Sequence, residues 1–168
     1  MIHLSERKSK SIADYFNSLS VVPVSISYEF DPNDQLKAME LDASEFNNKY
    51  VKEKDEDLKS IANGITGFKG HVTLNISEPM EFEHNDDYQS ISSKITNSIL
   101  KMYELHPTNF AACNLLGWDW QGQTNFSSEE INLAQKELDK RTKPLGISAR
   151  SKLLEQYANP VIRKLQSH

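Results

Sequence analysis

The order of apolar and polar positions predicts a chain of helices interrupted by two short strands. Apolar residues recur at helical spacing over residues 11–19, which predicts a helix there. Residues 21–28 follow directly and alternate as a strand does. Because Pro23 has no N–H to donate, this strand lies near an edge at that point or begins about there. The same alternation over residues 71–76 predicts a second strand.

The first predicted strand has two chemically different faces, since neighbouring side chains in a strand point to opposite sides. One face carries Val22, Val24, Ile26 and Tyr28, and the other carries Val21, Pro23, Ser25 and Ser27. We expect the two serines to point toward a covering helix or a pocket wall.

The rest of the regular structure is predicted to be helical. Asp34 follows a turn and is a candidate N-cap for a helix through Leu41. Ser127 and Glu130 form a capping box that opens a helix to about Arg141. Further helices are predicted over residues 54–65, from the end of the acidic loop 81–87 to Met102, over 107–116, and finally as separate helices around Leu153 to Tyr157 and Val161 to Leu165.

Each predicted strand follows a helix, which is typical of the end of a βαβ-type layered fold with a mostly parallel sheet. Two parallel strands alone make a poor sheet, because parallel strands are normally buried on both faces. We therefore expect a helix-rich, incomplete α/β fold that lacks its N-terminal strands. Residues 1–84 would form this α/β part, and residues 85–168 would form an all-helical extension packed on it.

Composition places the chain among globular proteins, with 168 residues, 38% hydrophobic and 26% charged. No apolar run approaches the roughly 20 residues of a membrane helix, and the N-terminus turns polar at once, unlike a signal peptide. The single cysteine, Cys113, cannot form an internal disulfide. These features predict a cytoplasmic protein, with peripheral contact at the inner face of the plasma membrane as a further expectation.

The net charge of −5 disfavours a nucleic-acid partner, but the charge is unevenly distributed. Residues 29–57 hold ten acidic and four basic side chains, whereas residues 136–164 hold eight basic and three acidic ones. Two interpretations remain open. The charges could cover solvated helical faces, or the basic C-terminal part could contact an anionic lipid surface.

No group of residues has the spacing of a known catalytic or metal site. The loop residues Glu81, Glu83, His84, Asp86 and Asp87 could ligate a cation, but they lack the glycine and bidentate glutamate of a calcium loop, so we expect no bound metal. Cys113 and His106 could be a nucleophile and its base, although a buried structural cysteine is the expected alternative.

Two further motifs have ordinary structural explanations. Gly64, Gly67 and Gly70 follow a helix and precede a strand, the reverse of the order that cradles a phosphate, and they are better explained as a helix stop and turn. Trp118 and Trp120 suit a membrane-interface anchor or a ligand-stacking site. A loop folded onto the core is the expected alternative.

Three segments together resemble the glycerophospholipid acyltransferase superfamily, whose members acylate glycerol-3-phosphate or 1-acylglycerol-3-phosphate. Residues 16–32 (FNSLSVVPVSISYEFDP) resemble its hydrophobic V-P-V block. Residues 64–72 (GITGFKGHV) and 105–112 (LHPTNFAA) resemble two later motifs of a bacterial branch. The resemblance extends from about Met1 to Leu116.

The resemblance also shows what the sequence lacks. The family's general base belongs to a His-x-x-x-x-Asp motif, and a Glu-Gly-x-Arg-like block binds the glycerol phosphate, both upstream of the V-P-V block. Neither motif occurs here, and no catalytic residue is predicted. The residues five positions after His3, His71, His84 and His106 are Lys8, Ile76, Gln89 and Ala111.

The resemblance therefore implies part of an acyltransferase of phospholipid biosynthesis that is inactive alone, from a truncated, split or decayed gene. Acyl-CoA or acyl-carrier protein would be the acyl donor, and no bound cofactor is expected. The wall of the substrate pocket would be formed by Val21, Val22, Pro23, Val24 and Ile26. A non-catalytic module that binds a lipid surface or another protein is the alternative.

Overall fold

The computed structural model describes residues 10–47, 54–120 and 124–166, and these form a helix-rich α/β protein. The chain divides into two compact units, each built from two separate stretches. Within the described residues, unit 1 comprises 10–27 and 73–104, and unit 2 comprises 28–47, 54–72, 105–120 and 124–166. This division cuts across the stretches 1–84 and 85–168 that we expected from the sequence.

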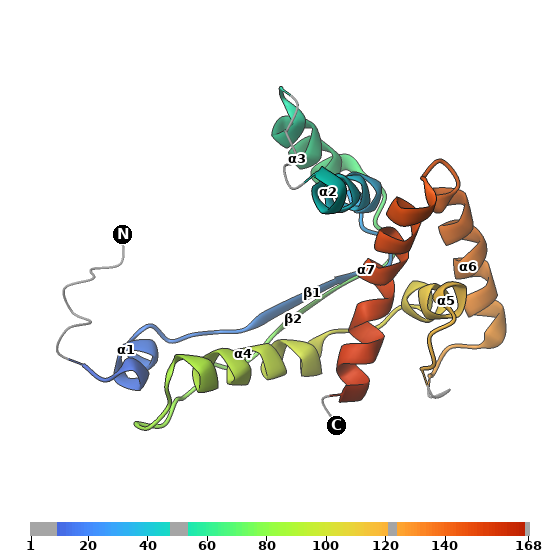
Figure 1. The fold of residues 1–168 in the computed structure, drawn as a ribbon. Helices are drawn as coiled ribbons and strands as arrows, with labels where there is room; N and C mark the ends of the chain where they lie inside the picture. Colours follow the sequence, from blue (N-terminus) through green and yellow to red (C-terminus); the bar gives the residue numbers. More distant parts are fainter. Residues whose placement is uncertain (1–9, 48–53, 121–123, 167–168) are drawn as a thin grey trace. The chain divides into compact units, whose positions relative to one another are not determined.

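Unit 1 contains α1 (Ile12–Ser18), most of the strands β1 (Val24–Tyr28) and β2 (Val72–Ile76), and α4 (Tyr88–Met102). The two strands lie side by side as a narrow ribbon (Figure 1). The core of unit 1 is small. Its buried apolar residues are Ala13, Phe82 and Ile91, and its partly buried ones are Ile12, Phe16, Val21, Met80 and Ile95.

The ribbon is antiparallel, so the parallel arrangement predicted for these two strands is wrong. The N–H of Glu29 donates to the carbonyl of His71 (2.8 Å), and the N–H of Ser77 donates to the carbonyl of Pro23 (3.1 Å). The C-terminal end of each strand thus pairs with the N-terminal end of the other. The chain between the strands forms α2 and α3 of unit 2 and then returns in the opposite direction, which no βαβ crossover does.

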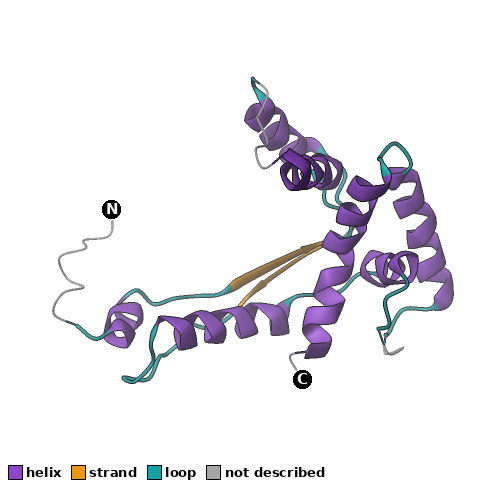
Figure 2. Cartoon of the chain, viewed as in Figure 1, coloured by secondary structure: helices purple, strands orange, loops and turns teal. Residues whose placement is uncertain are grey.

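Unit 2 is almost entirely helical (Figure 2). Helix α5 (Pro107–Leu116) packs against α6 (Ser128–Thr142) and α7 (Ile147–Gln166), and α2 (Asp34–Asn47) packs against α7. Helix α3 (Glu56–Thr66) completes the unit. The core, formed mainly by α5, α6 and α7, includes Phe110, Cys113, Leu138, Leu153, Leu154, Tyr157 and Val161.

Capping residues and apolar spacing predicted most of the helices correctly, but the C-terminal part was wrongly predicted as two helices. The capping box of Ser127 and Glu130 opens α6, and Asp87 caps α4 by accepting from the N–H of Ser90 (2.8 Å). However, the separate C-terminal helices predicted from the sequence are one continuous helix, α7, which includes Pro160. Tertiary packing on both sides of Pro160, by Tyr157 and Val161, supports the helix through the residue that breaks isolated helices.

The end of α3 depends on a close backbone approach at Gly67. A Cβ atom there would lie 2.5 Å from Cβ of Pro32 and 2.6 Å from the carbonyl oxygen of Asn63. We expect Gly67→Ala to lower the free energy of unfolding by about 1–3 kcal/mol, the usual cost of overpacking, in a urea titration followed by circular dichroism.

Two other glycines provide controls for this prediction. A Cβ at Gly146 would meet nothing within 4 Å, so Gly146→Ala should leave the unfolding midpoint close to that of the wild type. A Cβ at Gly64, inside α3, would lie 3.4 Å from Nδ2 of Asn33, and alanine there should stabilise the helix by about 0.5–1 kcal/mol. Equal effects at Gly67 and Gly146 would contradict the close approach.

Candidate functional site

The residues predicted to line a substrate pocket lie in and just before β1. The two hydrogen bonds that define the ribbon fix its register, in which Val24 lies opposite Ile76 and Ile26 lies opposite Leu74. These pairs place aliphatic side chains from both strands on one face. Ser25 and Ser27 lie on the other face, opposite Asn75 and Thr73.

The aliphatic face of the ribbon is exposed and its hydroxyl face is covered. Val22, Val24 and Ile26 expose 41–47% of their surface, and the aliphatic residues of β2 expose 45–65%. Ser25 and Ser27, by contrast, are 2% and 1% exposed. This is the reverse of an ordinary half-buried ribbon, in which water covers the polar face.

The five predicted wall residues therefore do not share one surface. Pro23 is buried, and Val21 packs against the small core of unit 1. Val22, Val24 and Ile26 form the exposed face. The alternation along the sequence correctly predicted that Val22, Val24 and Ile26 lie on a different face from Val21 and Pro23. Only the family resemblance placed all five residues in one pocket wall.

Helix α3 shows the same reversal within unit 2. Its apolar stripe of Leu58, Ile61 and Ile65 is 60–74% exposed, and none of its residues is buried. The opposite side is attached by polar contacts. Nδ2 of Asn63 donates to Oδ1 of Asn33 (2.9 Å) and to the carbonyl of Pro32, and Nδ2 of Asn33 donates to the carbonyl of Ser60 (3.1 Å).

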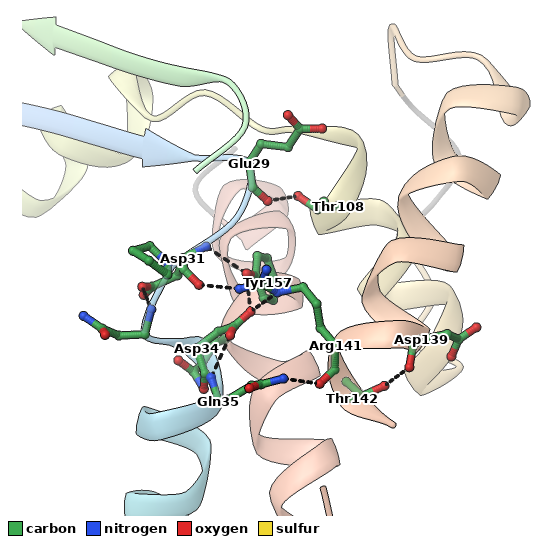
Figure 3. A network of polar contacts seen from close by, with 12 residues as sticks. Glu29, Asp31, Asp34, Gln35, Thr108, Asp139, Arg141, Thr142 and Tyr157 are labelled. Carbon is green, nitrogen blue, oxygen red and sulfur yellow. Dashed lines mark hydrogen bonds and ion pairs between the residues drawn. The ribbon is translucent and has the colours of Figure 1, made fainter. Parts of the chain in front are cut away.

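A buried polar cluster around Asp34 joins three parts of unit 2 (Figure 3). Oδ2 of Asp34 accepts from Nε of Arg141 at 2.7 Å and from the hydroxyl of Tyr157 at 2.8 Å. Its Oδ1 accepts from the N–H of Gln35 at 2.7 Å. The same Arg141 donates from Nη2 to the carbonyl of Asp31 at 2.9 Å. The cluster thus connects the start of α2 to the end of α6 and the middle of α7.

The electrostatics of this cluster indicate a structural role. Burial alone would lower the pKa of Arg141, but the hydrogen bond and charge of Asp34 outweigh it and raise that pKa. Burial, followed by the charge of Asp34, raises the pKa of Tyr157, so its hydroxyl stays protonated and donates. Because both carboxylate oxygens of Asp34 already accept hydrogen bonds and its side chain is 1% exposed, the group is not placed to act on a substrate.

Sequence reasoning missed this cluster. Local patterns indicate a helix cap at Asp34, an apolar stripe that includes Tyr157, and a helix end at Arg141. The one available signal was a tyrosine in the apolar stripe of α7, since a buried tyrosine hydroxyl usually has a hydrogen-bond partner. Nothing local identifies that partner, because Asp34 lies 123 positions earlier.

Unit 2 also contains a groove of about 930 Å³, which is within the size range of small-molecule sites. Phe30, Phe68, Leu133 and Ala134 contribute its apolar lining, and charged residues of α6 line it as well. Much of that charge is already paired, since Lys140 contacts Glu137 at 2.6 Å and Asp139 contacts Arg150 at 2.9 Å. The groove therefore suits an apolar ligand better than a phosphate, and Val21 to Ile26 do not line it.

Cys113 does not have the properties of a nucleophile. Cys113 is fully buried, and burial raises the pKa of its thiol to about 11. The N–H of His106 donates to Oδ1 of Asn109 (2.6 Å) at the start of α5, where His106 is the N-cap residue. Since the thiolate is the reactive form of cysteine, a thiol with this pKa is inert near neutral pH.

The acidic loop organises the start of α4. Oδ2 of Asp86 contacts Nζ of Lys94 (2.6 Å), and Oδ1 of Asp86 accepts from the hydroxyl of Ser90 (2.7 Å). The hydrogen bond from Lys94 lowers the pKa of Asp86. Among the described residues, no three His, Cys, Asp or Glu side chains lie close enough together to hold a metal ion.

The two tryptophans belong to the core of unit 2, as the loop interpretation predicted. Both pack partly buried against its apolar cluster. The Trp120 ring meets Phe110 edge to face at 5.0 Å, and its Nε1 donates to Oδ1 of Asn114 (2.9 Å).

Ion pairs neutralise much of the basic C-terminal segment. At least four of its eight basic side chains contact carboxylates, at 2.6–2.9 Å. The pairs are Lys140 with Glu137, Arg141 with Asp34, Arg150 with Asp139 and Lys152 with Glu45. These carboxylates offset part of the positive charge that the residue count gives this segment.

The described helices include none that combines the length and the apolar character needed to cross a membrane. Comparison with known proteins adds no assignment: no family model, no curated protein and no solved structure matches this chain.

Proposed function

We propose that this chain is one part of a glycerophospholipid acyltransferase, which transfers an acyl group from acyl-CoA or acyl-carrier protein to a 1-acylglycerol-3-phosphate-like acceptor. In this proposal the chain is inert alone, because the general base and the phosphate-binding block lie on a complementary segment. The chain contributes the V-P-V strand, β1. The sheet beside β1 is then completed by the complementary segment.

The proposal rests mainly on the burial pattern of the β1–β2 ribbon, whose aliphatic face is exposed and whose hydroxyl face is buried. Val22, Val24 and Ile26 belong to the block that resembles the family, and they are largely exposed although the serines between them are buried. Each large aliphatic side chain gains about 1.5–3 kcal/mol on burial, so an exposed aliphatic face favours a missing covering layer. The exposed stripe of α3 is a second face of the same kind.

Acyl transfer tests the proposal directly. The purified chain is mixed with radiolabelled acyl-CoA or acyl-carrier protein and 1-acylglycerol-3-phosphate, and the lipid product is counted. The chain alone should give no product. Coexpression with a polypeptide carrying the His-x-x-x-x-Asp and Glu-Gly-x-Arg-like motifs, identified by translating the preceding DNA in all frames, should give product, because a positioned base contributes about 10²–10⁴-fold.

Matched variants make this experiment specific to the ribbon. Leu74→Asp places a carboxylate on the exposed aliphatic face and should abolish the restored activity. Ile147→Asp makes the same kind of change at another exposed aliphatic residue, at the start of α7, and should not. Product from the chain alone, or the lack of both motifs in every frame, would overturn the proposal.

The alternative, a non-catalytic lipid-binding module, has less support from the described residues. Its attraction to lipid would come from the basic segment, at least half of whose charges are paired. Sedimentation with anionic phosphatidylglycerol vesicles discriminates between the two. Binding that persists at physiological salt, together with no restored acyl transfer, would favour the module.

A further inference from the structure

The charged residues that line the groove of unit 2 differ in whether another charge compensates them. Four of them have partners of opposite charge, namely Glu137, Asp139, Lys140 and Arg141. The other three have no ion pair among the described residues, namely Glu29, Glu130 and Lys136. The sign of the charge that a ligand meets in the groove therefore depends on these three.

Burial selects Glu29 as the dominant charge of the groove. Glu130 and Lys136 both lie on α6, are solvent-exposed and have opposite charges, so they largely cancel and are screened by salt. Glu29 is only partly exposed. Because a charge acts more strongly where water is partly excluded, the carboxylate of Glu29 makes the groove attractive to a cation.

Hydrogen bonds fix the position of Glu29. Its Oε2 accepts from the N–H of His71 (2.9 Å), and its main-chain carbonyl accepts from the hydroxyl of Thr108 (2.8 Å). Figure 3 shows its side chain pointing away from the Asp34 cluster. Its Oε1 has no hydrogen-bond partner among the described residues, and a carboxylate can accept through both oxygens. Oε1 is therefore available to a donor on a ligand.

The same groove presents an aromatic and aliphatic surface. Phe30 follows Glu29 in the chain, and its ring packs against that of Phe68 with the ring centroids 5.8 Å apart. Phe68 is 72% exposed, and Leu133 on α6 is 58% exposed. The guanidinium of Arg141 lies over the Phe30 ring at 5.4 Å, an arrangement in which an aromatic ring attracts a cation. The groove thus combines a carboxylate with apolar and aromatic surface, which suits a cation that has an apolar body.

We propose that this groove binds an organic ammonium ion with an apolar body, such as an aliphatic amine. The ammonium group donates to Oε1 of Glu29, and the apolar body covers Phe68 and Leu133. An aliphatic acid would instead bring its own carboxylate toward Glu29, where like charges repel. This binding uses only residues of unit 2 and leaves the exposed face of the ribbon free, so it is independent of the proposed acyl transfer.

Isothermal titration calorimetry of the purified chain with octylammonium, octanol and octanoate, each below its micelle concentration, tests the charge preference. Octylammonium should bind most tightly and octanoate least, with dissociation constants about tenfold or more apart. Glu29→Gln removes the charge but keeps an oxygen that can accept from the N–H of His71. It should weaken octylammonium binding about tenfold and leave octanol binding unchanged, which also shows that the groove of the variant is intact.

Two more variants separate the pairing with Glu29 from other effects. Glu129→Gln removes an exposed carboxylate in the first turn of α6 that does not line the groove, and it should change neither affinity. Leu133→Ser removes apolar surface and should weaken octylammonium and octanol by similar factors.

The order of the three ligands on the wild type needs no variant, so it decides the question even if Glu29→Gln does not fold. Octanoate binding as tightly as octylammonium would overturn the proposal, and so would an octylammonium affinity that Glu29→Gln leaves unchanged. If none of the three ligands binds, the groove is left to a segment of another polypeptide and the proposal is wrong.

Discussion

Replacing Asp34 with alanine should lower the free energy of unfolding by about 3–5 kcal/mol, the cost of breaking a buried ion pair by removing one partner. The substitution leaves Nε of Arg141 and the hydroxyl of Tyr157 without their shared acceptor in the interior of unit 2. It also releases Gln35, whose N–H donates to the other carboxylate oxygen. The start of α2 would then lose its attachment to α6 and α7.

Urea unfolding followed by tryptophan fluorescence measures this effect. Trp118 and Trp120 both pack against the core of unit 2, so their emission reports that unit. The control is Asp139→Ala, which breaks the ion pair with Arg150. Both partners of that pair are about half exposed, so the loss should be at most about 1 kcal/mol. If Asp34→Ala and Asp139→Ala lowered the free energy of unfolding by similar amounts, burial of the Asp34 cluster would not determine how much the cluster stabilises the fold.

The Asp34 cluster also marks the boundary of what the sequence could predict. Helices α5 and α6 were predicted closely, because a proline in the first turn and a capping box are encoded within a few residues. The two faces of β1 were predicted for the same reason, since alternation is local. The partners of Asp34, however, lie 107 and 123 positions away, and only the folded chain brings them together.

Strand direction failed as a prediction for a related reason. The order helix, strand, helix, strand is typical of parallel layered folds, but it is equally compatible with a hairpin-like return through an inserted pair of helices. Alternation shows which residues share a face, but it does not show which face is covered. In both the ribbon and α3 the exposed face is the apolar one, which no local pattern indicates.

The second large effect is expected in unit 1, at Phe82. Its ring is 5% exposed and meets the Phe16 ring edge to face at 5.9 Å. Its main chain is held on both sides by Asn17, which accepts from the N–H (2.8 Å) and donates to the carbonyl (2.9 Å). Phe82→Ala should cost about 3–5 kcal/mol. Because so few apolar residues are buried in unit 1, this loss should unfold the unit locally.

Hydrogen exchange can separate local from global unfolding in the Phe82→Ala variant. Amides of α4, including those of Ile91 and Ile95, should exchange much faster than in the wild type, whereas amides of α5 and α7 should not. The tryptophan transition, which reports unit 2, should keep its midpoint. Phe68→Ala removes the same ring from a position in unit 2 that is 72% exposed, and both measurements should change little. If the tryptophan midpoint instead falls together with the protection of α4, the two units unfold as one cooperative structure, and the small core of unit 1 draws its stability from unit 2.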